Sequence, residues 1–166
     1  MKSLGRCLLV ATAALLLTAS AFAQSDADQK FMSQLAQDGM KKIQSAYMAL
    51  QNSQNPQVRA YAQQILNDYG DAQNELIYLA NKEFVQLPRE LDTKDQDTLQ
   101  ALSQLQGPAF DKAYMSAMVD DDQTRLKQEA AKVDNLAIAD WASKTLPTLQ
   151  SDLKQAQKVA PAVGVR

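Results

Sequence analysis

The chain has 166 residues, no histidine and a single cysteine, and its 17 basic and 19 acidic residues give a net charge of −2. This length is enough for one domain with a substantial hydrophobic core. The small acidic excess disfavours nucleic acid as a partner, because phosphate binding requires a basic face. The absence of histidine removes the commonest general base, so we expect no enzymatic activity.

Residues 1–23 are predicted to be a cleaved export signal. Two basic residues precede an apolar run from Leu8 to Ala21, and Ala21-Phe22-Ala23 has small residues at the two positions that signal peptidase recognises. The alternative is an uncleaved anchor, but the run is shorter than the roughly 20 apolar residues of a membrane span. Cys7 lies at the beginning of this apolar segment, directly before Leu8, rather than after it, which disfavours a lipoprotein. We therefore expect a periplasmic protein that begins at Gln24, with no membrane span after cleavage.

Cleavage would leave 143 residues without any cysteine, so disulfide bonds could not stabilise the exported protein. It would also remove two basic residues, which changes the net charge to −4. No cluster of basic residues suggests a patch for anionic membranes. The stability of the domain must therefore come from packing alone.

The remaining residues predict helices, because Ala, Gln, Leu, Lys and Asp dominate and apolar residues recur at three- and four-residue steps. The predicted helices cover residues 26–51, 56–81, 93–105, 108–132 and 136–158. The third is short and follows Leu87-Pro88, an extended dipeptide, so it is expected to cross between two helix pairs. Pro147 is expected to kink the last helix. Residues 161–166 are predicted to be a disordered tail, and no strand pattern occurs.

One pattern, Asn-x-x-(Val/Ile)-x-x-aromatic-Ala-x-x-x-Leu, occurs twice, from Asn55 to Leu66 and again 80 residues later from Asn135 to Leu146. In each copy the asparagine is expected to cap the beginning of a helix, and in the first copy Pro56 takes the first helical position. Each copy also follows another predicted helix. Two related helix pairs packed face to face form a four-helix bundle. The aromatic residues of the copies, Tyr61 and Trp141, are expected to anchor helix–helix contacts rather than form a binding platform.

Several segments occur in the order of a known family: Gly39-Met40, Val58-x-x-Tyr61-Ala62, Asn67-Asp68, Leu87-Pro88, Gly107-x-Ala109-Phe110-Asp111-x-Ala113-Tyr114 and Leu146-Pro147-Thr148-Leu149. In these segments the chain resembles an exported bacterial domain of unknown function with a ferritin-like four-helix core, often labelled a predicted outer-membrane protein. The resemblance covers nearly the whole mature chain, and its last two segments are the most specific. It implies an all-α, ferritin-like antiparallel four-helix bundle over residues 24–160, with a short extra crossover helix.

Typical members of that family resemble metal-binding bundles, with a glutamate on the first helix and a histidine on each of the other three long helices. Alignment of the motifs places Lys42, Tyr69, Asp122 and Asp152 at those positions. The family's ligand types are therefore absent here. Zinc, copper or iron sites require imidazole, thiolate or several carboxylates, so we predict no metal and no other cofactor.

The four replacements suggest a polar layer in the bundle core. A lysine ammonium would repel a metal ion but attract two carboxylates, so Lys42, Asp122 and Asp152 are predicted to form an ionic network, with the Tyr69 hydroxyl as a donor. Such a network would fix the helix register more than it would add stability. The alternative is that these side chains extend into solvent and never meet, because charged residues are seldom fully buried unless they are paired.

Two other groups of residues have simple explanations. The carboxylates of Asp120-Asp121-Asp122 could bind calcium, but consecutive helical residues point in different directions and no spaced calcium loop is present, so a solvated acidic face is favoured. The methionines could bind copper, but they are favoured as packing residues.

The sequence therefore predicts a non-catalytic exported helical-bundle protein that binds an envelope protein or itself, or contributes to envelope stress tolerance. The stress role is implied by the resemblance alone. The alternative is a degenerate metal-binding ferritin-like protein with oxygen ligands at Tyr69, Asp122 and Asp152. A membrane-surface protein is disfavoured by the narrow apolar stripes and the missing basic face.

Overall fold

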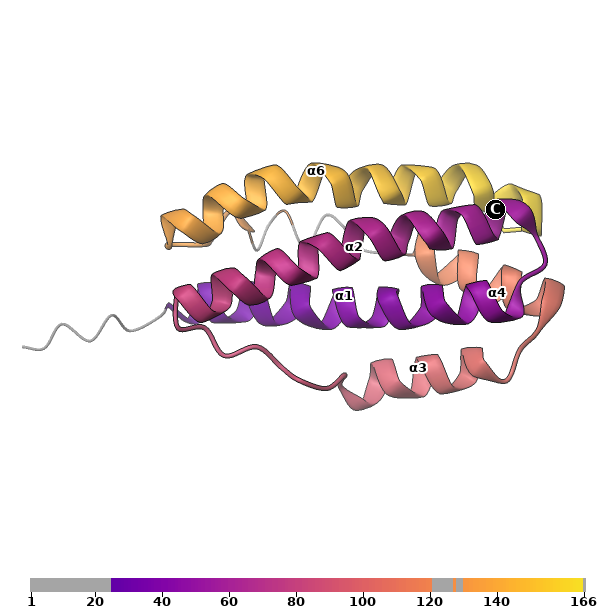
Figure 1. Cartoon of the computed structure of the whole chain (residues 1–166), viewed down its shortest axis with the longest axis horizontal. Coiled ribbons are helices and arrows are strands. Elements are labelled where there is room, and N and C mark those ends of the chain that lie inside the picture. Colours follow the sequence, from indigo (N-terminus) through magenta and orange to yellow (C-terminus); the bar gives the residue numbers. More distant parts are fainter. Residues whose placement is uncertain (1–24, 121–126, 128–129, 166) are drawn as a thin grey trace, which may run out of the picture.

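The prediction of an all-α bundle is confirmed by the computed structural model, which describes residues 25–120, 127 and 130–165 and contains no strand among them. Its elements are α1 (Asp26–Asn52), α2 (Pro56–Lys82), α3 (Thr93–Ser103), α4 (Gly107–Val119), α6 (Leu136–Val159) and the 3-10 helix η1 (Ala160–Val163). The helices α1, α2 and α6 extend along the long axis of the molecule, and α3 lies on the outer side of α1 (Figure 1).

The hairpin of α1 and α2 provides much of the core. A serine hydroxyl caps α1, because Ser25 accepts a hydrogen bond of 3.1 Å from the backbone N–H of Asp28. The apolar stripe of α1 is buried against α2, and Gly39 lies so close to Gln73 that a Cβ at this position would clash with the Gln73 side chain. The absence of a Cβ at Gly39 therefore leaves room for the end of the Gln73 side chain at mid-helix.

The two copies of the repeated pattern begin their helices in the same way. The side-chain oxygen of Asn55 accepts hydrogen bonds from the backbone of Gln57 at 2.9 Å and Val58 at 3.4 Å. The side-chain oxygen of Asn135 accepts the corresponding bonds from Ala137 at 2.8 Å and Ile138 at 3.2 Å. The repeat therefore specifies the N-termini of α2 and α6.

The two asparagine caps differ in one respect, which makes them a matched pair for measurement. The Asn135 amide also donates to a carboxylate oxygen of Glu83 at 2.6 Å. We expect Asn55→Ala to lower the free energy of unfolding by about 1 kcal/mol and Asn135→Ala by about 2 kcal/mol, because the second also removes the bond to Glu83. Denaturant unfolding checks both values, and equal losses would contradict this account.

Glutamine side chains attach the crossover segment to α1. The Gln29 amide donates to the backbone oxygen of Gln86 at 2.6 Å and accepts from its N–H at 3.2 Å. Gln37 binds the carbonyl of Glu90 at 2.8 Å and the N–H of Asp92 at 3.1 Å. These bonds satisfy backbone groups of an extended segment that would otherwise have only water as a partner.

The predicted helix over residues 108–132 differs from the structure. α4 ends at Val119, where the N–H of Asp120 donates to the carbonyl of Ser116 at 3.0 Å. Residues 121–126 and 128–129, with Asp121 and Asp122 among them, lie outside the described residues. The last helix, α6, begins at the predicted residue and ends one residue later than predicted, and it continues through Pro147.

The prediction of a disordered tail from residue 161 is wrong for residues 161–165. The last turn continues from α6 as η1, and Gly164 adopts φ +77°, which lets the N–H of Val165 bond to the carbonyl of Ala160 at 3.1 Å. Val163 and Val165 pack against the core. Their apolar side chains and the left-handed glycine explain why this end is ordered.

Within the described residues, every helix is too short or too polar to cross a lipid bilayer.

Candidate functional site

A buried lysine lies at the middle of the bundle. Lys42 follows Leu35 and Gly39 on the inward face of α1 and precedes Ala46, all at three- or four-residue steps, and only 4% of its surface is exposed. Its ammonium nitrogen lies 5.2 Å from the centroid of the Tyr69 ring on α2. This is the distance of a cation–π contact, which is stronger where water is excluded.

A buried carboxylate from α6 approaches the same region. Asp152 lies between Leu149 and Ala156 on the buried face of α6, with 1% of its surface exposed. One of its oxygens accepts a hydrogen bond of 2.8 Å from the side-chain amide of Gln64 on α2. Helix periodicity alone thus turns this polar residue inward.

Several causes together raise the pKa of Asp152 from its ordinary value of 3.8 to about 7, and burial is the largest of them. Repulsion by the nearby carboxylate of Asp68 and hydrogen bonding with that carboxylate act in the same direction. The bond from Gln64 and the charge of Lys42 act in the opposite direction and lower it. Near neutral pH, the Asp152 carboxyl is therefore protonated in a large part of the molecules.

α4 contributes an aromatic side chain whose polar tip is buried in the core. The Tyr114 ring stacks on Phe110 with centroids 5.8 Å apart and is tilted against Tyr61 at 6.2 Å. Its hydroxyl is buried and has no hydrogen bond to any described residue. Burial, and the charge of Asp152, raise the pKa of Tyr114, so it stays neutral. Buried polar atoms without partners are uncommon and are frequently associated with function.

The structure thus brings together three of the four residues predicted for the polar layer. Lys42 and Tyr69 are in contact, and Lys42 acts on the charge of Asp152. Asp122 lies outside the described residues. The Tyr69 ring lies against the Lys42 ammonium, and donation by the Tyr69 hydroxyl stays a prediction.

Three further residues belong to this layer and were not predicted: Gln64, Asp68 and Tyr114. Gln64 and Asp68 are one turn apart on α2, at the edge of its apolar stripe. The four-residue spacing predicts that Gln64 and Asp68 share one face of α2. It does not predict that α6 packs against that face. We call Lys42, Gln64, Asp68, Tyr69, Tyr114 and Asp152 the polar layer.

The chemistry open to the polar layer is limited. Among the described residues, no three carboxylate, thiol or imidazole side chains converge as metal ligands. A carboxyl with a pKa near 7 is a weak ligand at neutral pH, because metal binding requires its deprotonation. Lys42 would also repel a cation. The layer can hold and exchange a proton. Asp152 and Tyr114 are almost fully buried, whereas Asp68 lines a surface pocket between α2 and α6.

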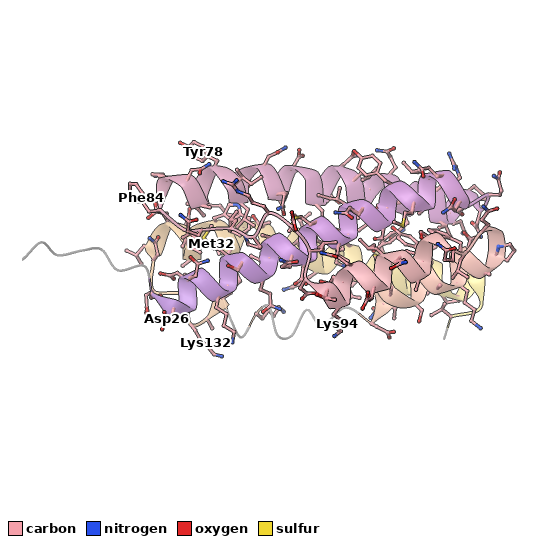
Figure 2. All side chains as sticks on the ribbon, turned by 90° about the horizontal axis from the view of Figure 1, so that it is seen from below. Asp26, Met32, Tyr78, Phe84, Lys94 and Lys132 are labelled. Atoms are coloured by element: carbon pink, nitrogen blue, oxygen red, sulfur yellow. The ribbon has the colours of Figure 1, made fainter. Side chains whose placement is uncertain are left out.

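A second feature is exposed. Large apolar side chains project from one end of the bundle, which we call the apolar end and define by Ile77, Tyr78, Phe84 and Leu136. Tyr78 and Phe84 lie at the end where Asp26 begins α1 (Figure 2). Ile77 lines a pocket beside the crossover segment, whereas Tyr78 lines one between α2 and α6. Exposed apolar residues that gather at one end of a molecule can mark a binding surface.

Phe84 combines exposure with backbone strain. It ends α2 in the left-handed conformation, with φ +57°, and it is the only described residue other than glycine with a positive φ. The N–H of Val85 bonds to the carbonyl of Ala80 at 2.8 Å, which completes a helix-ending turn that favours glycine at the position of Phe84. A phenylalanine there is strained by about 1–2 kcal/mol. Because 89% of it is exposed, packing does not offset this strain.

Beside the apolar end lies a hollow of about 540 Å³ between α2 and α6. It is lined by Asn74, Glu75, Tyr78, Leu79, Lys82, Ala137, Asp140 and Trp141. The indole N–H of Trp141 donates to a carboxylate oxygen of Glu75 at 3.0 Å, which links the two walls. Because Trp141 lines this hollow, its side chain is partly accessible. The expectation that Trp141 only anchors a helix–helix contact is therefore incomplete.

The end of the bundle that carries this hollow is held by a buried carboxylate. Asp28, on the first turn of α1, accepts hydrogen bonds from the backbone N–H groups of Asp134 at 2.9 Å and Asn135 at 3.3 Å. Asn135 in turn binds Glu83, the residue before Phe84. The beginnings of α1 and α6 and the end of α2 are thereby joined.

Comparison with known proteins agrees with the fold. The family described as "Domain of unknown function (DUF4142)" matches residues 14–159. Among solved structures, a DUF305 fragment from Deinococcus radiodurans is similar, with a TM-score of 0.67 and 13% sequence identity over 84% of this chain and 98% of that chain. At this identity the likeness concerns the fold alone. None of the curated proteins matches the sequence.

Proposed function

The chain belongs to the DUF4142 family, a domain of unknown function, and within that family we propose that it is a non-catalytic exported protein that binds another protein molecule in the bacterial envelope through its apolar end. The observation that carries this proposal is Phe84, which is held in a strained backbone conformation while its side chain faces solvent. Strain that folding does not require is commonly associated with function. A role in envelope stress tolerance would act through the same binding.

The non-catalytic part of the proposal is supported by the position of the reactive groups. Asp152 and Tyr114 have perturbed pKa values, which are typical of functional sites. Both are almost fully buried within the bundle, however. A catalytic group must reach its substrate, so these residues are better explained as structural parts of the core. The periplasmic location is part of the proposal and is supported by the signal pattern of residues 1–23.

Replacing Phe84 by glycine should separate binding from folding. Glycine adopts the left-handed conformation without strain, so we expect Phe84→Gly to raise the free energy of unfolding by about 1 kcal/mol. We also expect it to remove the products of a photo-crosslinking amino acid placed at Tyr78 in intact cells. Both measurements use the same variant, so a loss of crosslinks could not be attributed to misfolding.

The control is Tyr47→Ala, which removes an aromatic residue of α1 that is 57% exposed and lies near the opposite end of that helix. It should leave the crosslinked products unchanged. The proposal fails if Phe84→Gly retains all of them, or if position 78 gives none in the unmodified protein.

The competing function is a degenerate metal-binding bundle with oxygen ligands at Tyr69, Asp122 and Asp152. The proximity of the two carboxyl groups of Asp152 and Asp68 favours it. Lys42 and the raised pKa of Asp152 oppose it, so the described residues fit such an ion poorly. Elemental analysis of untagged protein decides between the two, because a stoichiometric transition metal that Asp152→Asn removes would replace the binding proposal.

A further inference from the structure

The hollow between α2 and α6 is lined by Tyr78, and Phe84 lies at the same end of the bundle as Tyr78 (Figure 2). The hollow has aromatic walls from Tyr78 and Trp141 and holds about 540 Å³, which is ample space for one aromatic side chain. The hydrogen bond between Asn135 and Glu83 places the turn that carries Phe84 against the beginning of α6. A projecting aromatic residue and an aromatic-walled hollow are therefore neighbours on this surface.

We propose that the apolar end binds a second copy of this chain about a two-fold axis, with Phe84 of each copy inserted into the hollow of the other. This inference rests on the proposed function and names its partner. A two-fold interface pairs the same surface with itself, so that surface must be self-complementary. A surface with both a projection and a matching hollow meets this requirement, whereas a flat apolar patch would not specify a partner.

The charges around the hollow support the same partner. Lys82 lines the hollow together with Glu75 and Asp140, and it forms no ion pair within the described part of the chain. In a two-fold arrangement Lys82 of one copy can pair with Glu75 of the other, whereas Asp140 is already paired with Lys144 of its own copy. The mixture of signs is unfavourable for an anionic lipid surface, which attracts clusters of lysine and arginine.

The available area indicates a reversible dimer. Tyr78 and Phe84 can each bury about 150–250 Å², so with Ile77 and Leu136 the apolar end presents on the order of 500 Å². With the polar rim, this approaches the roughly 800 Å² per partner of a standard interface. We therefore expect a dissociation constant on the order of 10 µM rather than a permanent dimer.

Sedimentation equilibrium of the untagged exported protein, from about 1 to about 200 µM, tests the inference. The unmodified protein should change from monomer to dimer over this range. Phe84→Gly should weaken dimerisation by at least about thirtyfold, as expected for a central aromatic contact, and should keep its helical circular dichroism. Tyr47→Ala should dimerise like the unmodified protein.

A mixing experiment tests whether Phe84 enters the hollow. Trp141→Ala damages the hollow and leaves Phe84 intact, whereas Phe84→Gly does the reverse. Each variant alone should be monomeric at about 50 µM. Their mixture should contain mixed dimers, because Phe84 of one variant can enter the intact hollow of the other. A mixture that stays monomeric would overturn the insertion geometry.

The outcomes also separate this inference from the proposed function. A protein that is monomeric at every concentration overturns the dimer. If such a monomer still gives crosslinks to a different envelope protein, and these crosslinks depend on Phe84, the proposed function stands without the dimer. If the protein is monomeric and sediments with phosphatidylcholine vesicles only when Phe84 is present, the apolar end binds lipid. That result would overturn both the dimer and the proposed binding of a protein.

Discussion

Replacing Lys42 by methionine should lower the free energy of unfolding by about 3 kcal/mol at about pH 8. Methionine keeps the length and most of the volume of the side chain, so a cavity does not explain a loss of this size. The change leaves the ionised Asp152 and Asp68 without a cation that offsets their repulsion. It also removes the cation–π contact with Tyr69. Denaturant unfolding monitored by circular dichroism provides the measurement.

The loss should be smaller at about pH 5, because Asp152 is then protonated and no longer needs a cation. Lys41→Met is the control. Lys41 is the neighbouring residue, is partly exposed and forms an ion pair with Asp95 at 3.1 Å, so its replacement should cost about 1 kcal/mol or less. An unchanged stability in Lys42→Met would show that the buried ammonium does not hold the polar layer together.

The raised pKa of Asp152 predicts an unusual pH dependence. The ordinary pKa is 3.8 and the folded value is about 7, so between these values the folded protein binds more protons at this carboxyl than the unfolded chain does. Its contribution to stability is fully present below the unfolded pKa and is lost as the pH rises through the folded pKa. The resulting slope approaches about −1.4 kcal/mol per pH unit.

Asp152→Asn isolates this contribution, because asparagine keeps the oxygen that accepts from Gln64 and cannot ionise. We expect it to raise the free energy of unfolding by on the order of 2 kcal/mol at about pH 8 and to have little effect at about pH 4. Asp140→Asn is the control, because Asp140 is exposed and pairs with Lys144 at 2.6 Å. It should follow the pH profile of the unmodified protein. Parallel profiles for Asp152→Asn and the unmodified protein would disprove the raised pKa.

The helix boundaries were predictable because they depend on residues close in sequence. Ser25, Asn55 and Asn135 accept hydrogen bonds from backbone groups only two or three residues away. A cap of this kind is encoded locally, and so is the inward direction of Lys42 and Asp152 on their helices. The family resemblance then placed these two residues in one layer, and the contacts of both agree with that placement.

The remaining features depend on contacts between distant residues, which periodicity does not contain. Gln64 reaches Asp152 across 88 residues, and neither residue predicts the other. The raised pKa of Asp152 depends on how closely Asp68 faces it. The strained backbone at Phe84 could not be predicted either. The segment contains Leu87-Pro88, which predicts extended backbone, but no glycine indicates a left-handed conformation at position 84.

The carboxylate of Asp28 has a consequence for the time course of folding. Its two backbone partners lie 106 and 107 residues further along the chain. The first turn of α1 is capped locally by Ser25, but the attachment of this turn to the beginning of α6 needs almost the whole chain. Contacts between such distant segments slow folding, so this attachment is expected to form later than the α1–α2 hairpin, whose contacts are closer in sequence.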